Sequence, residues 1–456
     1  MAMSAEERQQ MLLTQPVEKI IPKMALPTIC SMLITSIYNM ADTYFVSQIG
    51  TAEASASGTS ASAAVGIVFS VMAMIQALAF MFGMGSGTNV SHLLGMGKRK
   101  EAEVYSAVGF FSAVAAGNVF NEPLMRLLGA TETAMPYALD YARYIFLAAP
   151  FMMGSLSMNN LLRFQGLATY GMVGIISGGL LNMLLDPLLI FVFNMGIAGA
   201  SIATAISQLT SFVILLVMCG THADAITIHP RNYRPTKQMY AKILNNGLPS
   251  LGRQGIMSVS TSLLNNAAAV YGDPAIAAFA IVSRCLNFVN STVVGFGQGF
   301  QPVCGFNYGA RKYDRMHRAF SFSVKVTTIV LLVLGVAGFA FAEPVVTLFR
   351  RSDPEVIRIG TETFRIQILT VWAWGFITLS NMYTQAIGYG IRSTILAAAR
   401  QGLFLIPTLL VLPNVWGLRG LEVCQPLADV LTLALAAWMM TKVIRAQKAQ
   451  MAQETA

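Results

Sequence analysis

Long apolar stretches separated by short polar turns run through almost the whole sequence. Each holds about 20 residues or more, which is enough for an α-helix to cross ~30 Å of hydrocarbon. Six stretches precede the polar, proline-containing link "THADAITIHPRNYRPTK", and six follow it. The pattern therefore predicts an all-α polytopic membrane protein with twelve transmembrane helices. The predicted helices occupy residues 18–48, 58–84, 102–121, 134–163, 170–194, 197–220, 240–271, 274–300, 315–342, 356–387, 391–413 and 418–443.

The two sets of six helices repeat one another. The segment "ALPTICSMLITSIYNMADTYFVSQIG", which begins at Ala25, aligns with "GLPSLGRQGIMSVSTSLLNNAAAVYG", which begins at Gly247. In the same way "GMGSGTNVSHLLGMGKRK" aligns with "GFGQGFQPVCGFNYGARK" in the second half. Because each unit crosses the membrane an even number of times, both units have the same orientation, as in transporters with parallel repeats and a site at their interface. We therefore predict two parallel six-helix lobes. The expected parts are an N-terminal segment at 1–17, an N-lobe at 18–220, a linker at 221–239, a C-lobe at 240–443 and a tail at 444–456.

The first half departs from the second in two places. The segment "ASASGTSASA" is about ten residues longer than its counterpart. The apolar run at residues 104–120 covers only ~25 Å as a helix, which is short for a tilted crossing.

Basic residues gather in alternate loops. They are Lys98, Arg99, Lys100, Arg163, Arg231, Arg234, Lys237, Arg311, Lys312, Arg315, Arg318, Arg392, Lys442, Arg445 and Lys448. By the positive-inside rule these loops, the linker and both termini are cytoplasmic. The net charge of +9 therefore reports topology, and because it follows short loops and no continuous soluble face, we expect no nucleic-acid partner.

Several kinds of chemistry have no support in the sequence. The N-terminus lacks the features of a removable signal peptide, so we expect the first helix to remain in the protein. Neither a CxxC pair nor a GxxxxGK[ST] loop is present, and the five scattered cysteines are interpreted as small buried side chains. The glycine runs near residues 83–87 and 295–299 are better explained by close helix packing or by a turn at the cytoplasmic helix ends. We therefore expect no cofactor and no direct use of ATP.

Polar side chains gather at one depth in the predicted N-lobe. Asp42, Asp186 and Thr204 each lie ~10 to 12 Å from the outer end of their helix at 1.5 Å per residue. Tyr38 lies one turn from Asp42, and Asn182 lies one turn from Asp186. Pro187 removes a backbone donor and can free a further carbonyl oxygen. This set of hard oxygen ligands suits Na⁺ or a shared proton.

The two acids have either a functional or a purely structural role. A charge at mid-membrane costs ~3 kcal/mol even on a lenient insertion scale, which favours a function. In the repeat, Asp42 aligns with Leu264, Asp186 with Ile406 and Asn182 with Gly402. Since the equivalent positions are apolar, the fold itself does not require these polar groups.

Other polar residues carry weaker signals. Asp140 with Arg143, and Glu362 with Arg365, have the i, i+3 spacing of structural ion pairs near the outer surface. Arg253, Gln254 and Arg284 either snorkel, stabilise packing or line a cavity. The 27 methionines and 26 phenylalanines are enough to furnish a pliable apolar cavity, although most must face lipid or core.

The sequence resembles the multidrug and toxic compound extrusion (MATE) family over nearly its whole length. The resemblance rests on "YNMADTYFVSQIG", "LLNMLLDPLLIF", "GIAGASIATAISQ", "LLNNAAAVYGDPAIAAFAIVSR" and "GFGQGFQPVCGFNYGARKYDR". It implies that the two lobes form a V open alternately to each side, and that cationic amphipathic compounds are exported in exchange for Na⁺ or H⁺. It also implies a first-lobe cation site formed by Tyr38, Asp42, Asn182, Asp186 and Thr204, with the last four as ligands in the case of Na⁺.

The resemblance further implies a cellular setting. We expect a multi-pass protein of the bacterial plasma (inner) membrane that acts as a monomer, with the lipid bilayer and small lipophilic cations as its partners. Some family members place essential acids in the second lobe, where this chain has Arg253 and Gln254.

Two alternatives remain open at this point. A lipid-linked saccharide flippase would use a cationic groove for a pyrophosphate headgroup, and Arg253 and Arg284 are compatible with it. A remote alternative is an intramembrane aspartyl hydrolase that uses Asp42 and Asp186 as an acid pair, although no GxGD sequence is present.

Overall fold

The computed structural model describes residues 4–52, 58–118, 135–221, 225–350 and 353–455. These residues form helices and turns, and no strand occurs among them. The first half contains α1 (Ala5–Thr14), α2 (Val17–Ala52), α3 (Gly58–Gly95), α4 (Arg99–Gly117), α6 (Met135–Phe164), α7 (Ala168–Pro187), the π-helix η1 (Leu188–Val192) and α8 (Gly196–Thr221).

The second half follows the same order. It contains the 3₁₀-helix η2 (Pro230–Asn232), α9 (Lys237–Ala269), α10 (Asp273–Gly309), α11 (Tyr313–Ala340), α12 (Ala342–Phe349), α13 (Pro354–Ile368), α14 (Val371–Ala386), α15 (Gly390–Ala398), the π-helix η3 (Ala399–Leu403) and α16 (Leu405–Thr455). Helix α16 consists of two helices that meet at Gly417, where φ is 61°.

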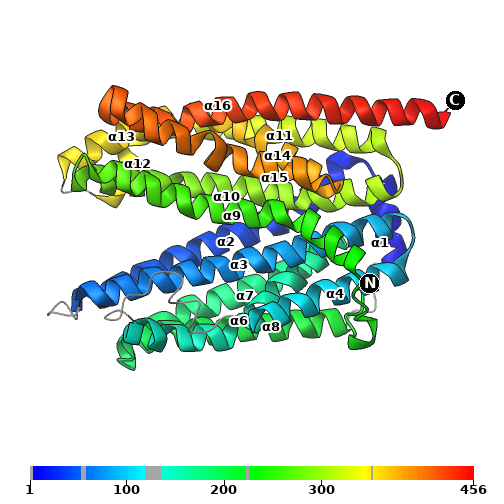
Figure 1. Ribbon diagram of the computed structural model, residues 1–456, viewed down its shortest axis with the longest axis horizontal. Helices are drawn as coiled ribbons and strands as arrows, with labels where there is room; N and C mark the ends of the chain where they lie inside the picture. Colours follow the sequence, from blue (N-terminus) through cyan, green and yellow to red (C-terminus); the bar gives the residue numbers. More distant parts are fainter. Residues whose placement is uncertain (1–3, 53–57, 119–134, 222–224, 351–352, 456) are drawn as a thin grey trace.

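The predicted fold of twelve transmembrane helices in two lobes is confirmed. Helices α2 to α8 form one lobe and α9 to α16 form the other, and the two lobes diverge as a V (Figure 1). Eight described stretches are long and apolar enough to cross a membrane by themselves: Val17–Asp42, Val71–Gly95, Ala142–Phe164, Ala168–Val192, Ala198–Thr221, Asp273–Gly309, Tyr313–Ala340 and Gly390–Gln453. The last of these contains two crossings, separated by the bend at Gly417. Helices α4, α9 and the α13–α14 pair provide the remaining crossings.

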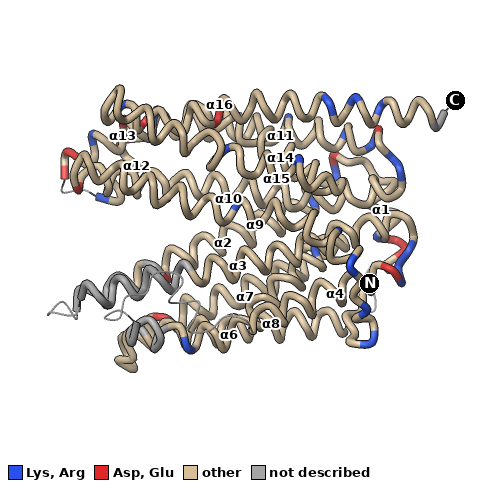
Figure 2. The backbone as a smooth tube through the Cα atoms, viewed as in Figure 1, with Lys and Arg blue, Asp and Glu red and all other residues tan. Residues whose placement is uncertain are grey.

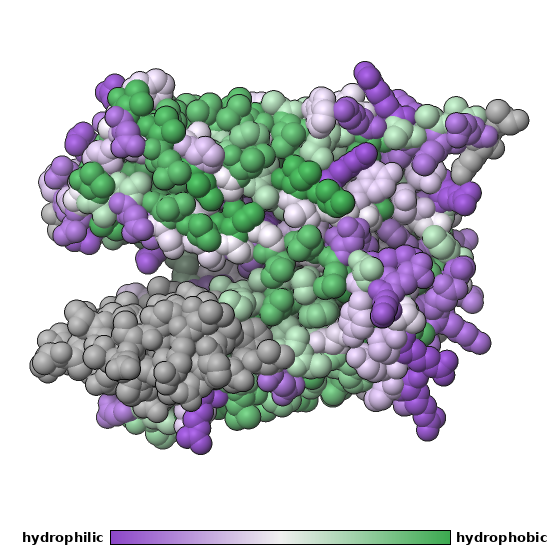
Figure 3. Space-filling model, viewed as in Figure 1, coloured by the Kyte–Doolittle hydropathy of each residue, from purple (hydrophilic) through white to green (hydrophobic). Residues whose placement is uncertain are grey.

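The surface agrees with a position in a membrane. Large apolar side chains such as Leu184, Val336 and Trp438 are exposed on the outside of the helices. Figure 3 shows apolar surface over the middle of the molecule and hydrophilic surface toward its ends. Lys and Arg gather mainly at the end that carries both termini (Figure 2). This clustering agrees with the basic-loop pattern, while the cytoplasmic orientation of that end stays a prediction.

The two lobes meet at the end that carries the termini, here called the closed end. Figure 3 shows a hollow between the lobes at the opposite end. Helix α3 crosses α9 and α2 crosses α10 at the closed end, and glycines allow both approaches. A Cβ atom at Gly247 would lie 2.1 Å from the carbonyl oxygen of Met81, and one at Gly299 would lie 2.4 Å from the Cα atom of Ala25. Helix α1 reaches both lobes, because Gln9 donates to the Leu94 carbonyl and Asn307 donates to the Leu12 carbonyl.

These crossings correct two predicted helix ends. The helices expected to end at residues 84 and 300 continue to Gly95 and Gly309. The glycines of these two runs lie in continuous helices and not in turns. As the close-packing interpretation expects, all lie against neighbouring helices: Gly85, Gly295 and Gly299 against the other lobe, and Gly83, Gly87 and Gly297 within their own lobe.

Other predicted boundaries also change. The helix expected at 356–387 is divided into α13 and α14 near Thr370, and the segment 1–17 contains α1, which Ser4 and Glu7 cap. The long segment at residues 54–63 is described only from Gly58, where α3 begins, and the short third helix is α4, which is described to Gly117. The rest of both segments lies outside the described residues.

Candidate functional site

Polar side chains from three N-lobe helices meet in the interior of that lobe. Asn182 on α7 donates from Nδ2 to Oδ1 of Asp186 at 3.2 Å and approaches Oγ1 of Thr204 on α8 at 3.5 Å. Asp42 reaches the same region from α2 and interacts electrostatically with Asp186. Asp186 is 0% exposed and Asp42 is 5% exposed. The fold therefore brings both acids, the amide and the hydroxyl together.

Tyr38 borders this set. Its ring packs against Gly179, where a Cβ atom would lie 3.3 Å from the tyrosine Cδ1 atom, and it interacts electrostatically with both Asp42 and Asp186. The absence of a side chain at Gly179 lets α2 approach α7 closely enough for this contact. All five residues predicted from the sequence thus lie in one region of the N-lobe.

Three oxygen atoms of this site are buried without a hydrogen-bond partner among the described residues. They are Oδ1 of Asp42, Oδ1 of Asn182 and Oδ2 of Asp186. A buried acceptor without a donor is costly, and a buried carboxylate also needs a compensating charge. Oxygen ligands of this kind fit a hard monovalent cation or a proton. The residues present therefore suit either coupling ion.

The corresponding region of the C-lobe is apolar. Leu264, the repeat counterpart of Asp42, belongs to a hydrophobic cluster that includes Leu405 and Leu409. Gly402, the counterpart of Asn182, lies against Ile256, whose Cγ2 atom would be 2.8 Å from an added Cβ. The polar set is therefore specific to the N-lobe.

The three second-lobe residues proposed from the sequence lie in two different environments. Arg284 is exposed on α10, whereas Arg253 and Gln254 are partly buried on α9. Ser250, one turn before them, donates to Sδ of Met84 in the N-lobe at 3.0 Å. Arg253 and Gln254 thus lie next to the contact between the lobes, and their role stays a prediction.

Arg163 corrects the loop assignment made from the sequence. It lies at the end of α6, is 1% exposed, and reaches across to the C-lobe. Its Nη1 donates to the Gln298 carbonyl at 2.8 Å and to Oε1 of Gln301 at 3.0 Å, while its Nη2 donates to Oδ1 of Asn160 at 2.6 Å. Protein oxygens replace water around Nη1 and Nη2, which explains how the guanidinium can be buried, although Nε has no hydrogen-bond partner among the described residues.

Pro302 explains why Gln298 can accept this bond. In a regular helix the Gln298 carbonyl would accept from the N–H of residue 302, but proline has no N–H. Arg163 supplies the missing donor from the other lobe. Pro302 in "VVGFGQGFQPVCGF" lies just beyond the predicted helix end at residue 300, and its missing N–H is the signal in the sequence for a carbonyl without a backbone donor.

Hydrogen bonds extend this contact across the closed end. Gln301 donates to Oε1 of Gln385 at 3.0 Å, and Gln385 donates to Oγ of Ser250 at 3.0 Å and to the Asn246 carbonyl at 2.9 Å. Gln385 is the repeat counterpart of Arg163, since each lies one turn before a glycine with a left-handed backbone. These glycines are Gly166, with a φ of 79°, and Gly388, with a φ of 83°. A polar chain therefore joins the lobes below the hollow.

One predicted ion pair is wrong, and another is outside the described side chains. Glu362 and Arg365 are both described and form no ion pair; Arg365 instead lies 5.6 Å from the ring centroid of Phe339. Glu362 points to solvent, where water solvates its charge, so a pair there would add little. The side chain of Asp140 is not described, so its pairing with Arg143 stays a prediction.

Comparisons with known proteins agree with this architecture. A family profile described as MatE matches residues 27–188 and 249–410, and the two matches begin at prolines that the internal repeat also aligns. The multidrug export protein MepA of Staphylococcus aureus (strain MSSA476) is 27% identical over 437 residues, which cover 94% of each chain. MepA of Staphylococcus saprophyticus is 26% identical over 428 residues, which cover 92% of each chain.

Solved structures share the fold. One, described as the outward-facing conformation of a multidrug resistance MATE family transporter of the MOP superfamily, has a TM-score of 0.87 at 24% identity and covers 96% of this chain and 98% of its own. A MATE crystal structure in complex with MaL6 has a TM-score of 0.88 at 23% identity, with 97% and 99% covered.

Proposed function

Because the chain belongs to the MatE family, whose members are transporters and not enzymes, we propose that it is a secondary active multidrug exporter. It exports small cationic amphipathic compounds and takes up Na⁺ or H⁺ in exchange through alternating access. The observation that carries the proposal is the group of partnerless oxygens on Asp42, Asn182 and Asp186 inside the N-lobe. Family membership excludes the intramembrane aspartyl hydrolase.

The coupling follows from electrostatics in the N-lobe. Two carboxylates in a low-dielectric interior repel each other, so the site favours uptake of a proton or Na⁺. A cation that binds the two conformations with different affinity shifts the balance between them. Loading from the outer side and discharge toward the inner side would thus drive the lobes through their cycle. Asn182 holds Asp186 in place and approaches Thr204, and both residues contribute further oxygens in the case of Na⁺.

Substrate class is supported by the relatives and by the composition. The staphylococcal relatives are named multidrug export proteins. Methionine and phenylalanine side chains adapt to varied apolar shapes, and the N-lobe acids provide a negative field that attracts lipophilic cations. We further infer a monomer in the bacterial plasma membrane, with both termini and the linker in the cytoplasm and the hollow facing outward.

A lipid-linked saccharide flippase remains the second candidate. Arg253 favours it, because this partly buried guanidinium next to the lobe contact pairs with no acid among the described residues. Transport of a pyrophosphate-linked lipid that depends on Arg253, without export of cationic dyes, would favour the flippase.

The test measures ethidium export from proteoliposomes under separately imposed Na⁺ and proton gradients. Asp42→Asn and Asp186→Asn should reduce export to the rate of protein-free liposomes and leave thermal stability in detergent nearly unchanged. Leu264→Asn is the matched control, since it introduces the same amide at the repeat counterpart of Asp42 and should preserve export. Well-folded acid variants that export at the unmodified rate would show that the acids are structural.

A further inference from the structure

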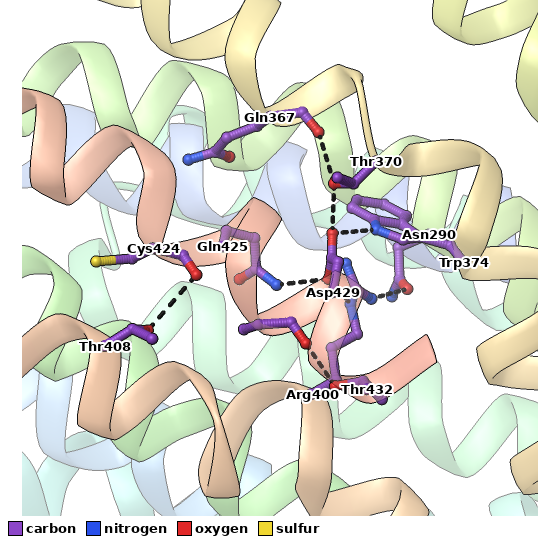
Figure 4. Close-up of polar contacts among 11 residues, drawn as sticks. Asn290, Gln367, Thr370, Trp374, Arg400, Thr408, Cys424, Gln425, Asp429 and Thr432 are labelled. Atoms are coloured by element: carbon purple, nitrogen blue, oxygen red, sulfur yellow. Dashed lines mark hydrogen bonds and ion pairs between the residues drawn. The ribbon is translucent and has the colours of Figure 1, made fainter. Parts of the chain in front are cut away.

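Two buried carboxylates lie inside the C-lobe, where the sequence suggested none: Glu422, which is 1% exposed and accepts from Oγ1 of Thr363, and Asp429. Asp429 on α16 is 0% exposed and accepts four hydrogen bonds (Figure 4). Its Oδ1 accepts from Nε of Arg400 at 2.8 Å and from Nε2 of Gln425 at 3.0 Å. Its Oδ2 accepts from Oγ1 of Thr370 at 2.8 Å and from Nε1 of Trp374 at 2.7 Å. Both oxygens of this acid are therefore fully used.

Arg400 is held tightly in this cluster. It lies in the π-helix η3, whose wider turn changes the direction of side chains relative to an α-helix. Its guanidinium lies 3.8 Å from the ring centroid of Trp374, and its Nη1 donates to Oδ1 of Asn290 at 3.4 Å. The side chain is only 13% exposed. Side chains on α10, α14 and α16 thus fix the orientation of the Arg400 guanidinium beside the Asp429 carboxylate.

The buried carboxylates at Asp42 and Asp186 differ from Asp429 in whether a cationic side chain contacts them. In the N-lobe, buried acids on α2 and α7 have no cationic side chain as hydrogen-bond partner among the described residues and retain partnerless oxygens. In the C-lobe, the π-helix that follows α15 supplies the cation, as η1 follows α7 in the N-lobe. In the described part of the chain, the charged side chain that contacts Asp429 is Arg400. The other hydrogen-bond donors to Asp429, from Thr370, Trp374 and Gln425, are neutral.

We propose that Arg400 is a tethered cation that permanently fills a second cation site at Asp429, so that coupling ions do not exchange at this acid. Arginine remains protonated in proteins, and its covalent attachment prevents exchange with the solvent. Arg400 therefore determines how many coupling ions the transporter binds. Removal of Arg400 opens Asp429 to one proton or one monovalent cation. This inference rests on the proposed exchange of cations in the N-lobe.

The experiment counts bound cations in detergent-purified protein. Radioactive Na⁺ measures sodium binding, and the infrared carbonyl stretch of a buried carboxylic acid measures protonation. The parent carries Asp42→Asn, Asp186→Asn and Glu422→Gln, which remove the N-lobe acids and the other buried C-lobe acid, and should bind no cation. Adding Arg400→Met should create one site per chain for Na⁺ or a proton. Arg400→Lys, which keeps a tethered cation, should create none, and Arg400→Met with Asp429→Asn should abolish the new site.

Each outcome decides the proposal. A folded Arg400→Met variant that gains neither Na⁺ nor a protonated acid overturns it. If Arg400→Met unfolds, Asp429→Asn should rescue folding because it removes the uncompensated charge, and a double variant that also fails to fold overturns the proposal. Residual cation binding in the parent counts against the proposed N-lobe site, while the comparison of Arg400→Met with and without Asp429→Asn still tests the C-lobe.

Discussion

Gly247→Ala should weaken the contact between the lobes at the closed end. The added Cβ would lie 2.1 Å from the carbonyl oxygen, 2.8 Å from the carbonyl carbon and 2.9 Å from Cγ of Met81. Comfortable contacts between carbon atoms begin near ~3.5 Å, so α9 and α3 must separate by roughly 1 Å. Overpacking of this kind costs about 1–3 kcal/mol, against which alanine gains up to about 1 kcal/mol in helix propensity.

The net cost falls only on the conformation in which α3 and α9 touch. A net loss of about 1.4 kcal/mol would shift the balance between conformations about tenfold toward opening of the closed end. Spin labels at Lys100 and Arg392, exposed residues of the N-lobe and the C-lobe, would report this as a longer distance in the variant. The labels require a background in which the native cysteines are replaced.

Gly255→Ala is the matched control on the same helix. A Cβ atom at Gly255 would meet no neighbouring atom within 4 Å. The substitution should therefore leave the label distance unchanged and should raise the melting temperature slightly. Identical distance distributions and melting temperatures for Gly247→Ala and Gly255→Ala would refute the argument that this glycine sets the lobe contact.

Three further results are expected. Arg163→Met should destabilise the protein by about 1 kcal/mol less in a Pro302→Ala background, because residue 302 then supplies the donor for the Gln298 carbonyl; equal melting-temperature losses in both backgrounds would contradict this. If Na⁺ is the coupling ion, Thr204→Val should raise the Na⁺ concentration for half-maximal export roughly fivefold to tenfold, since one oxygen ligand is lost; an unchanged Na⁺ dependence would exclude the hydroxyl as a ligand. A single cysteine at Arg234 should react with impermeant reagents only from the cytoplasmic side, and labelling only from outside would reverse the proposed topology.

Much of the fold could be predicted from the sequence because it depends on local properties. The length and hydrophobicity of each stretch determine whether it crosses a membrane, and the repeat that aligns Pro27 with Pro249 relates the two lobes. Depth along each helix placed Asp42, Asp186 and Thr204 at one level, and the structure brings them together. Counting residues works there because the rise per residue of a helix is constant.

The closed end and the C-lobe cluster depended on the tertiary structure. Arg163 has the sequence context of a loop residue, and only the crossing of α6 with α10 surrounds it with acceptors. Arg400 and Asp429 are 29 residues apart, and a π-turn sets the direction of the arginine.

The physical reason is that the free energy of a buried charge depends on the partners that surround it. A sequence shows that a charge lies in an apolar segment, and its depth follows from helix geometry. Some buried acids have no cationic side chain as hydrogen-bond partner among the described residues, as at Asp42 and Asp186, and others are compensated, as at Asp429. Side chains on other helices decide between these cases.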